Sequence, residues 1–585
     1  MDVLFKFTSS LATFVLILGF VGIVSSCIRL WALPRSLPVA GAKGNSHLSR
    51  TRAYLTSWLS YHRSRAVAYA EFSKLGKPFI SPNPSLSPDI VIPPQHVKWL
   101  LSQPSSVVAQ RPALWEGMAI RYMFTGADPN AEFVPALVKR HMSLGNVDVM
   151  QAQMYRSIQR WTDISLGTTP NDGWKEVSLF DAVGFIMQRV GYRLYFGPAL
   201  AENEELGQVL QTMGNWAAVG GLVIGQFSPM VFRKPLGWLF RLPLAYYTRR
   251  YKRIWEPVVR EKLERVQQLQ KGQRGAEESR DDGSATAGAA EALARNRRYT
   301  VESMSSNFMI MYGIAANVKL PGSLALLLNL ITLPEARTYL PLLRQEIETV
   351  LFEPTAWTDP ETFTPRKMPL ATAFTRESMR YSPLVANIPV RTVVARDGVI
   401  LPDGTQVPCG ASLSCPAEAM TRDERFFPDP DRFNPFRFLV EEETPPTDTA
   451  DRKRDSTKES RYILRPDGNL TAASETFLFF GYGPHFCPGR FFMVRLLMVL
   501  LAYIVKHYDF EPTTTQRPVG IRAGFVNLPP LGTRHDDFQQ HDTSRHHLAR
   551  GAHGMPAYPT PFHDIKKAQW TNLQDGQNAP ILSTI

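Results

Sequence analysis

Apolar and polar positions along the chain predict a mainly helical protein with a small β-sheet region. Residues 53–269 follow helical periodicity for most of their length, with turn-rich breaks at 81–88 and 168–173. Residues 305–333 and 491–508 are almost continuously apolar, which predicts two long buried helices. Residues 391–414 instead alternate polar and apolar side chains around Asp403 and Gly404, a pattern typical of a β-hairpin.

Three polar stretches interrupt this pattern. Residues 272–298 begin with a run that lacks large apolar side chains, and residues 441–467 are rich in Pro, Thr, Asp and Lys, so both are expected to be solvated loops. Residues 533–585 are expected to form a disordered tail, because their histidines lack the regular spacing of a metal site. These histidines are His535, His541, His546, His547, His553 and His563.

The first apolar stretch predicts a membrane anchor. Residues 7–28 carry no charge and meet the length of about 20 residues that a spanning helix needs. A cleavable signal peptide is the alternative, with Ser25 and Ser26 as small residues beside the cut. Five basic residues between Arg29 and Arg52 would hold that flank in the cytoplasm. We therefore expect residues 1–38 to be a single-pass anchor with a stiff Pro-containing hinge, followed by one large domain at 39–532.

Composition and charge narrow the classes of function. The chain has 585 residues, of which 44% are hydrophobic, enough for a substantial core. Its net charge is +12, but the basic residues are scattered, so nucleic-acid binding is not expected. A membrane surface or an acidic protein partner fits this charge better. Only four cysteines occur, which argues against a disulfide scaffold and for a reducing compartment.

One of these cysteines lies in a loop suited to holding a metal. Residues 480–489 read Phe-Gly-Tyr-Gly-Pro-His-Phe-Cys-Pro-Gly and precede the second long apolar helix. The glycines permit close backbone approach and positive φ, and the amides at the start of the helix favour the thiolate form of Cys487. A structural cysteine buried in a turn is the simpler alternative. A single thiolate shielded by aromatic side chains suits an axial haem ligand.

The same ten residues resemble the haem-binding loop of the cytochrome P450 family, whose pattern is Phe-x-x-Gly-x-Arg/His-x-Cys-x-Gly. The residues that fill this pattern in register are Phe480, Gly483, His485, Cys487 and Gly489. The resemblance implies a mainly α (α+β) P450 fold with a small β-sheet region, preceded by one N-terminal transmembrane helix. It also implies haem b ligated by Cys487, with His485 at a haem propionate.

A second motif lies in the helix predicted at 368–380. Glu377 and Arg380 share a face with apolar residues, and a carboxylate on such a face is costly unless it is paired. The pair resembles the family's buried Glu-x-x-Arg salt bridge. The family's third member is an Arg in a Pro-x-Arg-Phe segment, and the resemblance assigns it to Arg432. We expect this triad to brace the thiolate loop without a catalytic role.

Further candidate residues follow from the same resemblance. Arg391 corresponds to the family's second propionate arginine. The basic run from Lys139 to His141 is a candidate for a third contact, with a solvent-facing helix surface as the alternative. Residues 384–390 and 524–529 correspond to substrate-facing segments, with strand packing as the alternative. Both are apolar with one Asn each, which predicts a hydrophobic substrate.

The predicted helix at 305–333 departs from the family pattern. Counting back from Pro334 places Asn317 and Val318 where the family usually has an acid followed by Thr, the pair that relays protons during oxygen activation. Pro321 should kink the helix and free a backbone carbonyl. We hypothesise that water held by Asn317 and this carbonyl replaces the missing hydroxyl.

These features predict a haem-thiolate monooxygenase anchored in the endoplasmic reticulum membrane, with its catalytic domain in the cytosol. It would use electrons from NADPH, delivered by a cytochrome P450 reductase, to insert oxygen from O2 into a lipophilic small molecule. The resemblance to fungal membrane-bound members suggests secondary metabolite biosynthesis. A haem-thiolate isomerase or dehydratase that needs no external electrons is the first alternative, favoured by the missing Thr. A membrane-tethered haem-binding protein without turnover is the second.

Overall fold

The computed structural model describes a mainly helical chain with several small sheets. The described residues are 17, 19–126, 133–167, 175–271, 283–296, 299–388, 390–441, 462–472, 474–483, 486–511, 518, 520–523, 526–528, 530 and 535–540. They all belong to one compact unit that ends at Gln540. This architecture agrees with the expected mainly α (α+β) class with a small β-sheet region.

The helices account for most of the described residues. Before the predicted long apolar helix they are α2 (His47–Leu59), α3 (Tyr61–Glu71), α4 (Val97–Ser102), α5 (Gln110–Gly117), α6 (Ile120–Met123), α7 (Phe133–His141), α8 (Leu144–Leu166), α9 (Leu179–Phe196), α10 (Pro198–Ala201), α11 (Glu204–Gly220), α12 (Met230–Gln270) and α13 (Ala285–Arg295). From that helix onward they are α14 (Val301–Thr332), α15 (Pro334–Arg337), α16 (Leu340–Val350), α17 (Pro369–Tyr381), α18 (Ala417–Thr421) and α19 (Arg490–His507). The predictions of buried helices at 305–333 and 491–508 are confirmed by α14 and α19.

The largest described sheet has the strand order β1-β2-β8-β5-β3. The strands of all sheets are β1 (Phe79–Pro82), β2 (Pro88–Val91), β3 (Val108–Ala109), β4 (Lys175–Ser178), β5 (Arg391–Val393), β6 (Val399–Ile400), β7 (Gln406–Val407), β8 (Ser412–Ser414), β9 (Leu439–Glu441), β10 (Tyr462–Leu464), β11 (Tyr508–Glu511), β12 (Ile521–Ala523), β13 (Val526–Leu528) and β14 (His535–Gln540). Strands β6 and β7 pair antiparallel on either side of Gly404, which has φ +84°. The predicted hairpin is therefore confirmed.

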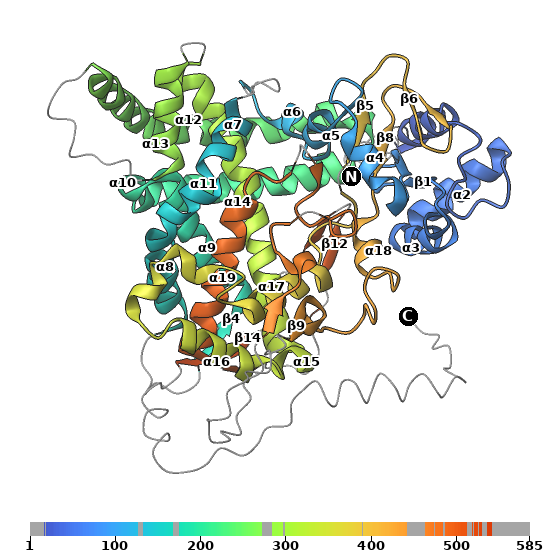
Figure 1. Cartoon of the computed structure of the whole chain (residues 1–585). Helices are drawn as coiled ribbons and strands as arrows, with labels where there is room; N and C mark the ends of the chain where they lie inside the picture. Colours follow the sequence, from blue (N-terminus) through green and yellow to red (C-terminus); the bar gives the residue numbers. More distant parts are fainter. Residues whose placement is uncertain are drawn as a thin grey trace, which may run out of the picture. The chain divides into compact units, whose positions relative to one another are not determined.

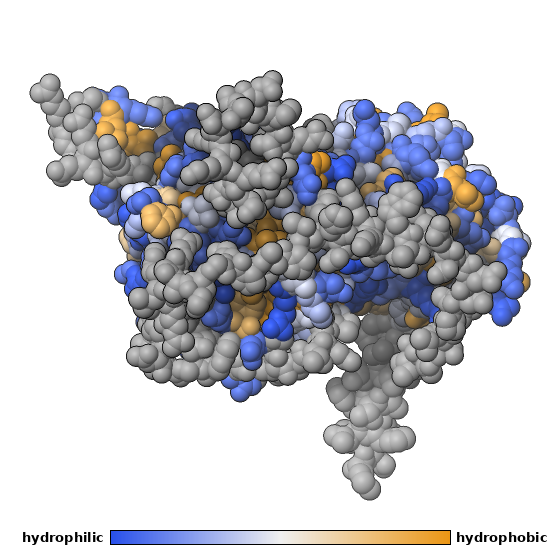
Figure 2. All heavy atoms as spheres, turned by 60° about the horizontal axis from the view of Figure 1, so that its bottom comes forward, coloured by the Kyte–Doolittle hydropathy of each residue, from blue (hydrophilic) through white to orange (hydrophobic). Residues whose placement is uncertain are grey.

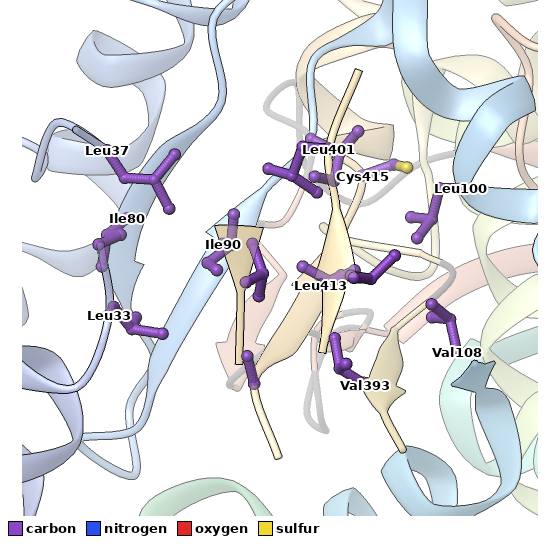
Figure 3. Close-up of a cluster of buried hydrophobic side chains, with 14 of the residues drawn as sticks. Leu33, Leu37, Ile80, Ile90, Leu100, Val108, Val393, Leu401, Leu413 and Cys415 are labelled. Atoms are coloured by element: carbon purple, nitrogen blue, oxygen red, sulfur yellow. The ribbon is translucent and has the colours of Figure 1, made fainter. Parts of the chain in front are cut away.

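A cluster of buried apolar side chains packs around this largest sheet, next to α2 and α3 (Figure 1). Ile90 and Leu413 come from adjacent parallel strands and lie near Leu37 and Leu100 in Figure 3. On the face shown in Figure 2, hydrophilic residues cover most of the described surface and apolar residues form small separate patches. Burial of the cluster is the main force that holds the sheet against the helices.

The expected extended hinge at residues 33–38 is wrong. Leu33 and Leu37 are buried in the cluster around the sheet, and the amide of Ile80 donates a hydrogen bond to the carbonyl of Pro38. The backbone turns here. In a turned backbone, residues four positions apart lie on the same side, so both leucines face the same apolar surface. Half of the predicted anchor at 7–28 lies outside the described residues. Among the described residues, no helix has the length and apolar content needed to cross a membrane.

The polar stretch at 272–298 is not a loop throughout, contrary to our expectation. Residues 285–295 form α13, and its side chains Ala289 and Ala290 are fully buried. Alanine favours helix, and its small side chain lets α13 approach α12 and α9 closely. Thr286 accepts a hydrogen bond from Trp255 and donates one to the carbonyl of Tyr195. Small side chains that pack closely, together with buried Leu293, therefore hold this helix in place.

The other two polar stretches contribute strands at their described ends. The stretch at 441–467 begins in β9 and contains β10, and these two strands pair antiparallel, so the segment between them connects a hairpin. The tail expected from 533 onward includes β14, whose backbone pairs with both β11 and β4. The remainder of that expected tail, from residue 541, lies outside the described residues.

Helices α14, α17 and α19 pack against one another in the helical part of the structure (Figure 1). The first turn of α17 is completed by a neighbouring helix. Pro369 at its first position has no N–H, and the next two amides, of Leu370 and Ala371, donate to the two carboxylate oxygens of Glu346 at 2.8 Å each. Glu346 belongs to α16, so this cap also ties α16 to α17.

The pH dependence of this cap gives a first prediction. Desolvation raises the pKa of Glu346 from 4.5 to about 7, although the two amide hydrogen bonds oppose that shift. The folded state therefore binds a proton more tightly than the unfolded chain between these values, and stability falls as the pH rises from about 4.5 to about 7. The Glu346→Gln variant should lack this contribution.

Urea unfolding of both proteins across this pH range measures the difference. The unfolding free energy of the wild type should fall relative to that of the variant by as much as about 3 kcal/mol, and the difference should then level off. A constant difference from acidic to neutral pH would show that Glu346 does not titrate in this way.

Candidate cofactor site around Cys487

The loop before α19 folds into a compact turn around Cys487. The amide of Cys487 donates to the carbonyl of Phe480 at 2.9 Å, which brings the two ends of the motif together. Gly481 and Gly483 have φ of +77° and +74°, so the expected positive φ is confirmed at both. Gly489 has an ordinary φ of −87° and serves close approach instead, because an added Cβ would lie 3.1 Å from the sulfur of Met142.

The surroundings of the Cys487 sulfur act on its ionisation in opposite directions. Burial raises the pKa of the Cys487 thiol, whereas the amide of Gly489 and the charge of Arg490 favour the thiolate. Arg490 also lies over the rings of Phe486 and Phe491, at 4.7 and 4.2 Å from their centroids. Burial has the largest effect, so a thiolate at this position needs a cation to compensate it.

Glu377 and Arg380 form the buried ion pair that the sequence predicts. Both side chains have no exposed surface, and the Nε and Nη2 atoms of Arg380 each lie 2.8 Å from a carboxylate oxygen of Glu377. The Nη1 atom of Arg380 donates to the carbonyls of Thr421 and Pro430 at 2.8 and 2.7 Å. This geometry is bidentate and supplies the hydrogen bonds that a buried charge requires.

The third member of this cluster is Arg437 and not Arg432. The Nε atom of Arg437 lies 3.1 Å from Glu377, whereas the side chain of Arg432 is exposed and only its carbonyl accepts from Arg380, at 3.2 Å. A second Pro-x-Arg-Phe segment, at residues 435–438, is separated from the first by Asn434 alone. The four-residue pattern alone does not distinguish the two copies. The amide of Asn434 also donates to Glu377, at 2.8 Å, and fixes this register.

Arg391 is a buried cation without a described anionic partner. It lies in β5 with 2% of its surface exposed, and its one described side-chain hydrogen bond goes to the carbonyl of Val390, at 3.3 Å. Burial lowers the pKa of Arg391 to about 10. Among the described residues no carboxylate lies within ion-pair distance of it. A buried guanidinium left in this state fits a haem propionate.

In the basic run at the end of α7, Lys139 and Arg140 lie at the surface and His141 lies in the interior. Lys139 is exposed, and Arg140 pairs with Glu291 of α13 at 2.7 Å. His141 is buried, and neither of its ring nitrogens has a described hydrogen-bond partner. Its ring lies against Gly288, where an added Cβ would be 1.4 Å from Nε2. Of the three, only His141 keeps unused hydrogen-bonding capacity inside the protein.

Two predicted site residues fall outside what the structure describes. His485 lies between described residues of the Cys487 loop, and the side chain of Asn317 lies within the part of α14 whose side chains are not described. The backbone of α14 is nevertheless helical through residue 317 and Pro321. Because proline lacks an N–H, the carbonyl of residue 317 has no helical donor four residues later. Both assignments remain predictions.

The two segments expected to face the substrate lie side by side. Val385 forms an antiparallel bridge with Val526, and the amide of Asn527 donates to the carbonyl of Leu384 at 2.8 Å. Leu384 also approaches α14, because an added Cβ on Gly322 would lie 3.8 Å from its side chain. The side-chain nitrogen of Asn527 donates to the carbonyl of Pro383 at 3.0 Å, whereas its side-chain oxygen is buried without a described hydrogen-bond partner.

The described residues fit a haem with a cysteine ligand. A Gly-rich turn holds the thiol, a buried guanidinium lacks an anion, and α14 passes the segment that joins α17 to β5. Cys487 would hold the iron, and Arg391 would hold a propionate. Phe480, Gly483 and Gly489 shape the backbone of this loop.

The correction to the ion-pair cluster gives a second prediction. Arg437→Ala removes a guanidinium from a fully buried carboxylate and should lower the free energy of unfolding by about 3 kcal/mol. Arg432→Ala should cost less than about 0.5 kcal/mol, because only its backbone contacts the cluster. Chemical denaturation of the two variants provides the comparison. Equal losses, or a larger loss for Arg432→Ala, would contradict the assignment.

Comparison with known proteins agrees with this site. The family model described as Cytochrome P450 matches residues 195–533, which include Glu377, Arg391 and Cys487. Cytochrome P450 monooxygenase polB of Polytolypa hystricis is 28% identical over 510 residues, covering 86% of this chain and 93% of that protein. Cytochrome P450 monooxygenase fsoD of Humicola fuscoatra is 27% identical over 535 residues, covering 86% and 92%.

A third relative, cytochrome P450 monooxygenase lnaC of Aspergillus flavus, is 27% identical over 532 residues, covering 87% of this chain and 93% of that protein. The family is defined by a haem bound through a cysteine thiolate, which is the chemistry that the Cys487 loop fits. Since the family model spans more than half of the chain and its relatives match along most of their length, this protein belongs to the cytochrome P450 monooxygenase family.

Proposed function

We propose that this protein inserts one oxygen atom from O2 into a lipophilic small molecule, using electrons from NADPH delivered by a cytochrome P450 reductase. The observation that carries the proposal is the loop that presents Cys487, closed by its hydrogen bond to Phe480. When bound there, a haem b with a thiolate ligand supplies oxygen activation: R–H, O2, two electrons and two protons give R–OH and water. Names of the fungal relatives support a monooxygenase.

The protein's own residues hold the cofactor and exclude water. Cys487 ligates the iron, while Arg391 and His485 neutralise the propionates. The adjacent segments at 384–388 and 526–528 form an apolar wall, which favours a hydrophobic substrate. We place the reaction in fungal secondary metabolite biosynthesis, in keeping with the fungal relatives.

We also propose a location at the endoplasmic reticulum membrane, with the catalytic part in the cytosol. Exposed apolar side chains support a membrane surface: Phe20 of the helical residues 19–31 and Trp238 and Leu242 of α12 are 67%, 70% and 75% exposed. This N-terminal helix packs against the start of α12, since an added Cβ on Gly22 would lie 3.1 Å from Pro229.

The cysteine ligand gives a third prediction. Cys487→Ser should abolish the absorption band of the reduced carbon monoxide complex that reports thiolate ligation, and with it all NADPH-dependent consumption of metabolites from a strain that lacks this gene. Cys409→Ser is the matched control, because Cys409 is exposed, and it should leave both readouts unchanged. An unaltered spectrum of the Cys487→Ser variant would refute the assignment of Cys487 as the iron ligand.

A haem-thiolate isomerase or dehydratase is the second candidate, favoured by the residues at 317 and 318 where the family usually has an acid and Thr. The same assay separates the two reactions. Consumption that proceeds at full rate without NADPH and reductase would favour rearrangement over oxygen insertion. A haem-binding protein without turnover would consume nothing under either condition.

Proton delivery by Asn317 gives a fourth prediction. We propose that Asn317 and its own carbonyl, which Pro321 leaves without a helical donor, hold a water that delivers protons to the site. Asn317→Leu should divert NADPH consumption into hydrogen peroxide by about tenfold or more, as removal of a positioned proton donor typically costs at least that factor. An assay of peroxide released per NADPH consumed measures this leak. Unchanged product yield and unchanged peroxide would exclude Asn317 from the route.

A further inference from the structure

Arg376 is a buried cation next to the Glu377–Arg380 pair, with no role in that pair. It has 2% of its surface exposed, and no carboxylate among the described residues lies within ion-pair distance of it. Its Nη1 atom donates to the carbonyl of Asn469 at 2.9 Å, while its Nε atom has no described partner. A guanidinium in this position is costly unless something else compensates its charge.

The compensation comes from aromatic rings. The guanidinium carbon lies 3.5 Å from the centroid of the Phe477 ring and 5.7 Å from that of Phe438. Such stacking is attractive because the ring face is negative, and it strengthens when water is excluded. Burial lowers the pKa of Arg376 to about 9, which leaves the side chain positively charged at neutral pH.

Phe477 begins the segment that leads to Cys487. Its ring stacks with Phe479, with centroids 6.3 Å apart, and Phe479 meets Phe480 edge to face at 4.9 Å. Phe480 in turn accepts the hydrogen bond from the amide of Cys487. On the other side, Phe479 lines a small cavity together with Thr375 of α17. Arg376 therefore lies at the start of an aromatic series that ends at the thiolate loop.

We propose that Arg376 is a positioning residue that fixes this aromatic series on α17 and whose buried positive charge makes the reduction potential of the haem more positive. The proposal rests on the proposed haem site. Reduction adds one electron to the cofactor, and a buried cation stabilises that added charge more than an exposed one, because water screens it less. Among the described residues, Asp467 raises the pKa of Arg376, but Asp467 is exposed and paired with Arg465 at 3.1 Å.

Spectroelectrochemical titration of the purified holoenzyme with dithionite tests the charge. Arg376→Gln should shift the midpoint potential of the haem to a more negative value, whereas Arg376→Lys, which keeps the charge, should retain most of the wild-type potential. Lys367→Gln is the matched control, because it removes a positive charge from a half-exposed side chain just before the same helix, and its potential should not move. A potential for Arg376→Gln equal to that of Lys367→Gln, or equal shifts in both Arg376 variants, would overturn the proposal.

Phe477→Leu tests the positioning role with a spectroscopic readout. It removes the stacked ring and leaves the charge, so the fraction of reduced carbon monoxide complex that shows the thiolate band should fall. An unchanged fraction would overturn the positioning role. This measurement tests that role even if the Arg376→Gln variant does not accumulate as folded protein. If the wild type itself lacked the thiolate band, the proposed function would fail. A wild type with the band and variants indistinguishable from it would refute the inference about Arg376 alone.

Discussion

The buried ion pair between Glu377 and Arg380 is the interaction on which the rest of the site depends. Removing two charges from water costs several kcal/mol for each ion, and mutual attraction alone rarely offsets this. Here the remaining hydrogen-bonding capacity is used by Arg437, the amide of Asn434 and carbonyls of the segment at 421–432. Since these partners all come from one stretch of chain, the pair can be buried only when that stretch lies on α17.

Helix α17 is consequently the support that several parts of the site share. Its first turn is capped from α16, its middle carries Arg376, and its last turn carries the ion pair. The chain that leaves it passes α14 at Leu384 and enters β5 at Arg391. The residue proposed to hold a propionate and the segment proposed to face the substrate therefore both follow the same helix. A disturbance at either of its ends is expected to reach both.

Motifs with fixed spacing were predictable from the sequence, because their geometry is local. The Cys487 loop, the Glu377–Arg380 pair and the long buried helices depend on neighbours within a few residues. Arg437 was missed because the same four-residue pattern occurs twice in succession. Only tertiary packing determines which of the two arginines contacts Glu377. Strands β1 and β2 were likewise missed within a region of helical periodicity, since β2 joins them to the sheet through β8, which lies far along the chain.

Composition misled where small or isolated residues pack unusually well. The Ala-rich stretch that forms α13 carries one long apolar side chain, Leu293, and its many small side chains let its backbone approach other helices closely. Leu33 and Leu37 were expected to lie in a stiff hinge between anchor and domain. Instead, both side chains attach a turn to the sheet by packing into its apolar cluster. Neither the helix α13 nor the buried turn follows from side-chain polarity alone. Both depend on the shape of the protein surface against which they pack.

Strand β14 has a consequence for any shortened form of this enzyme. It is the middle strand of a three-stranded sheet, with β11 on one side and β4 on the other, although these neighbours are more than 300 residues apart. Ending the polypeptide at residue 532 would take away the centre and leave two separate edges with open amide and carbonyl groups. Such edges recruit strands from other molecules, so self-association would be the expected fate of that shortened protein.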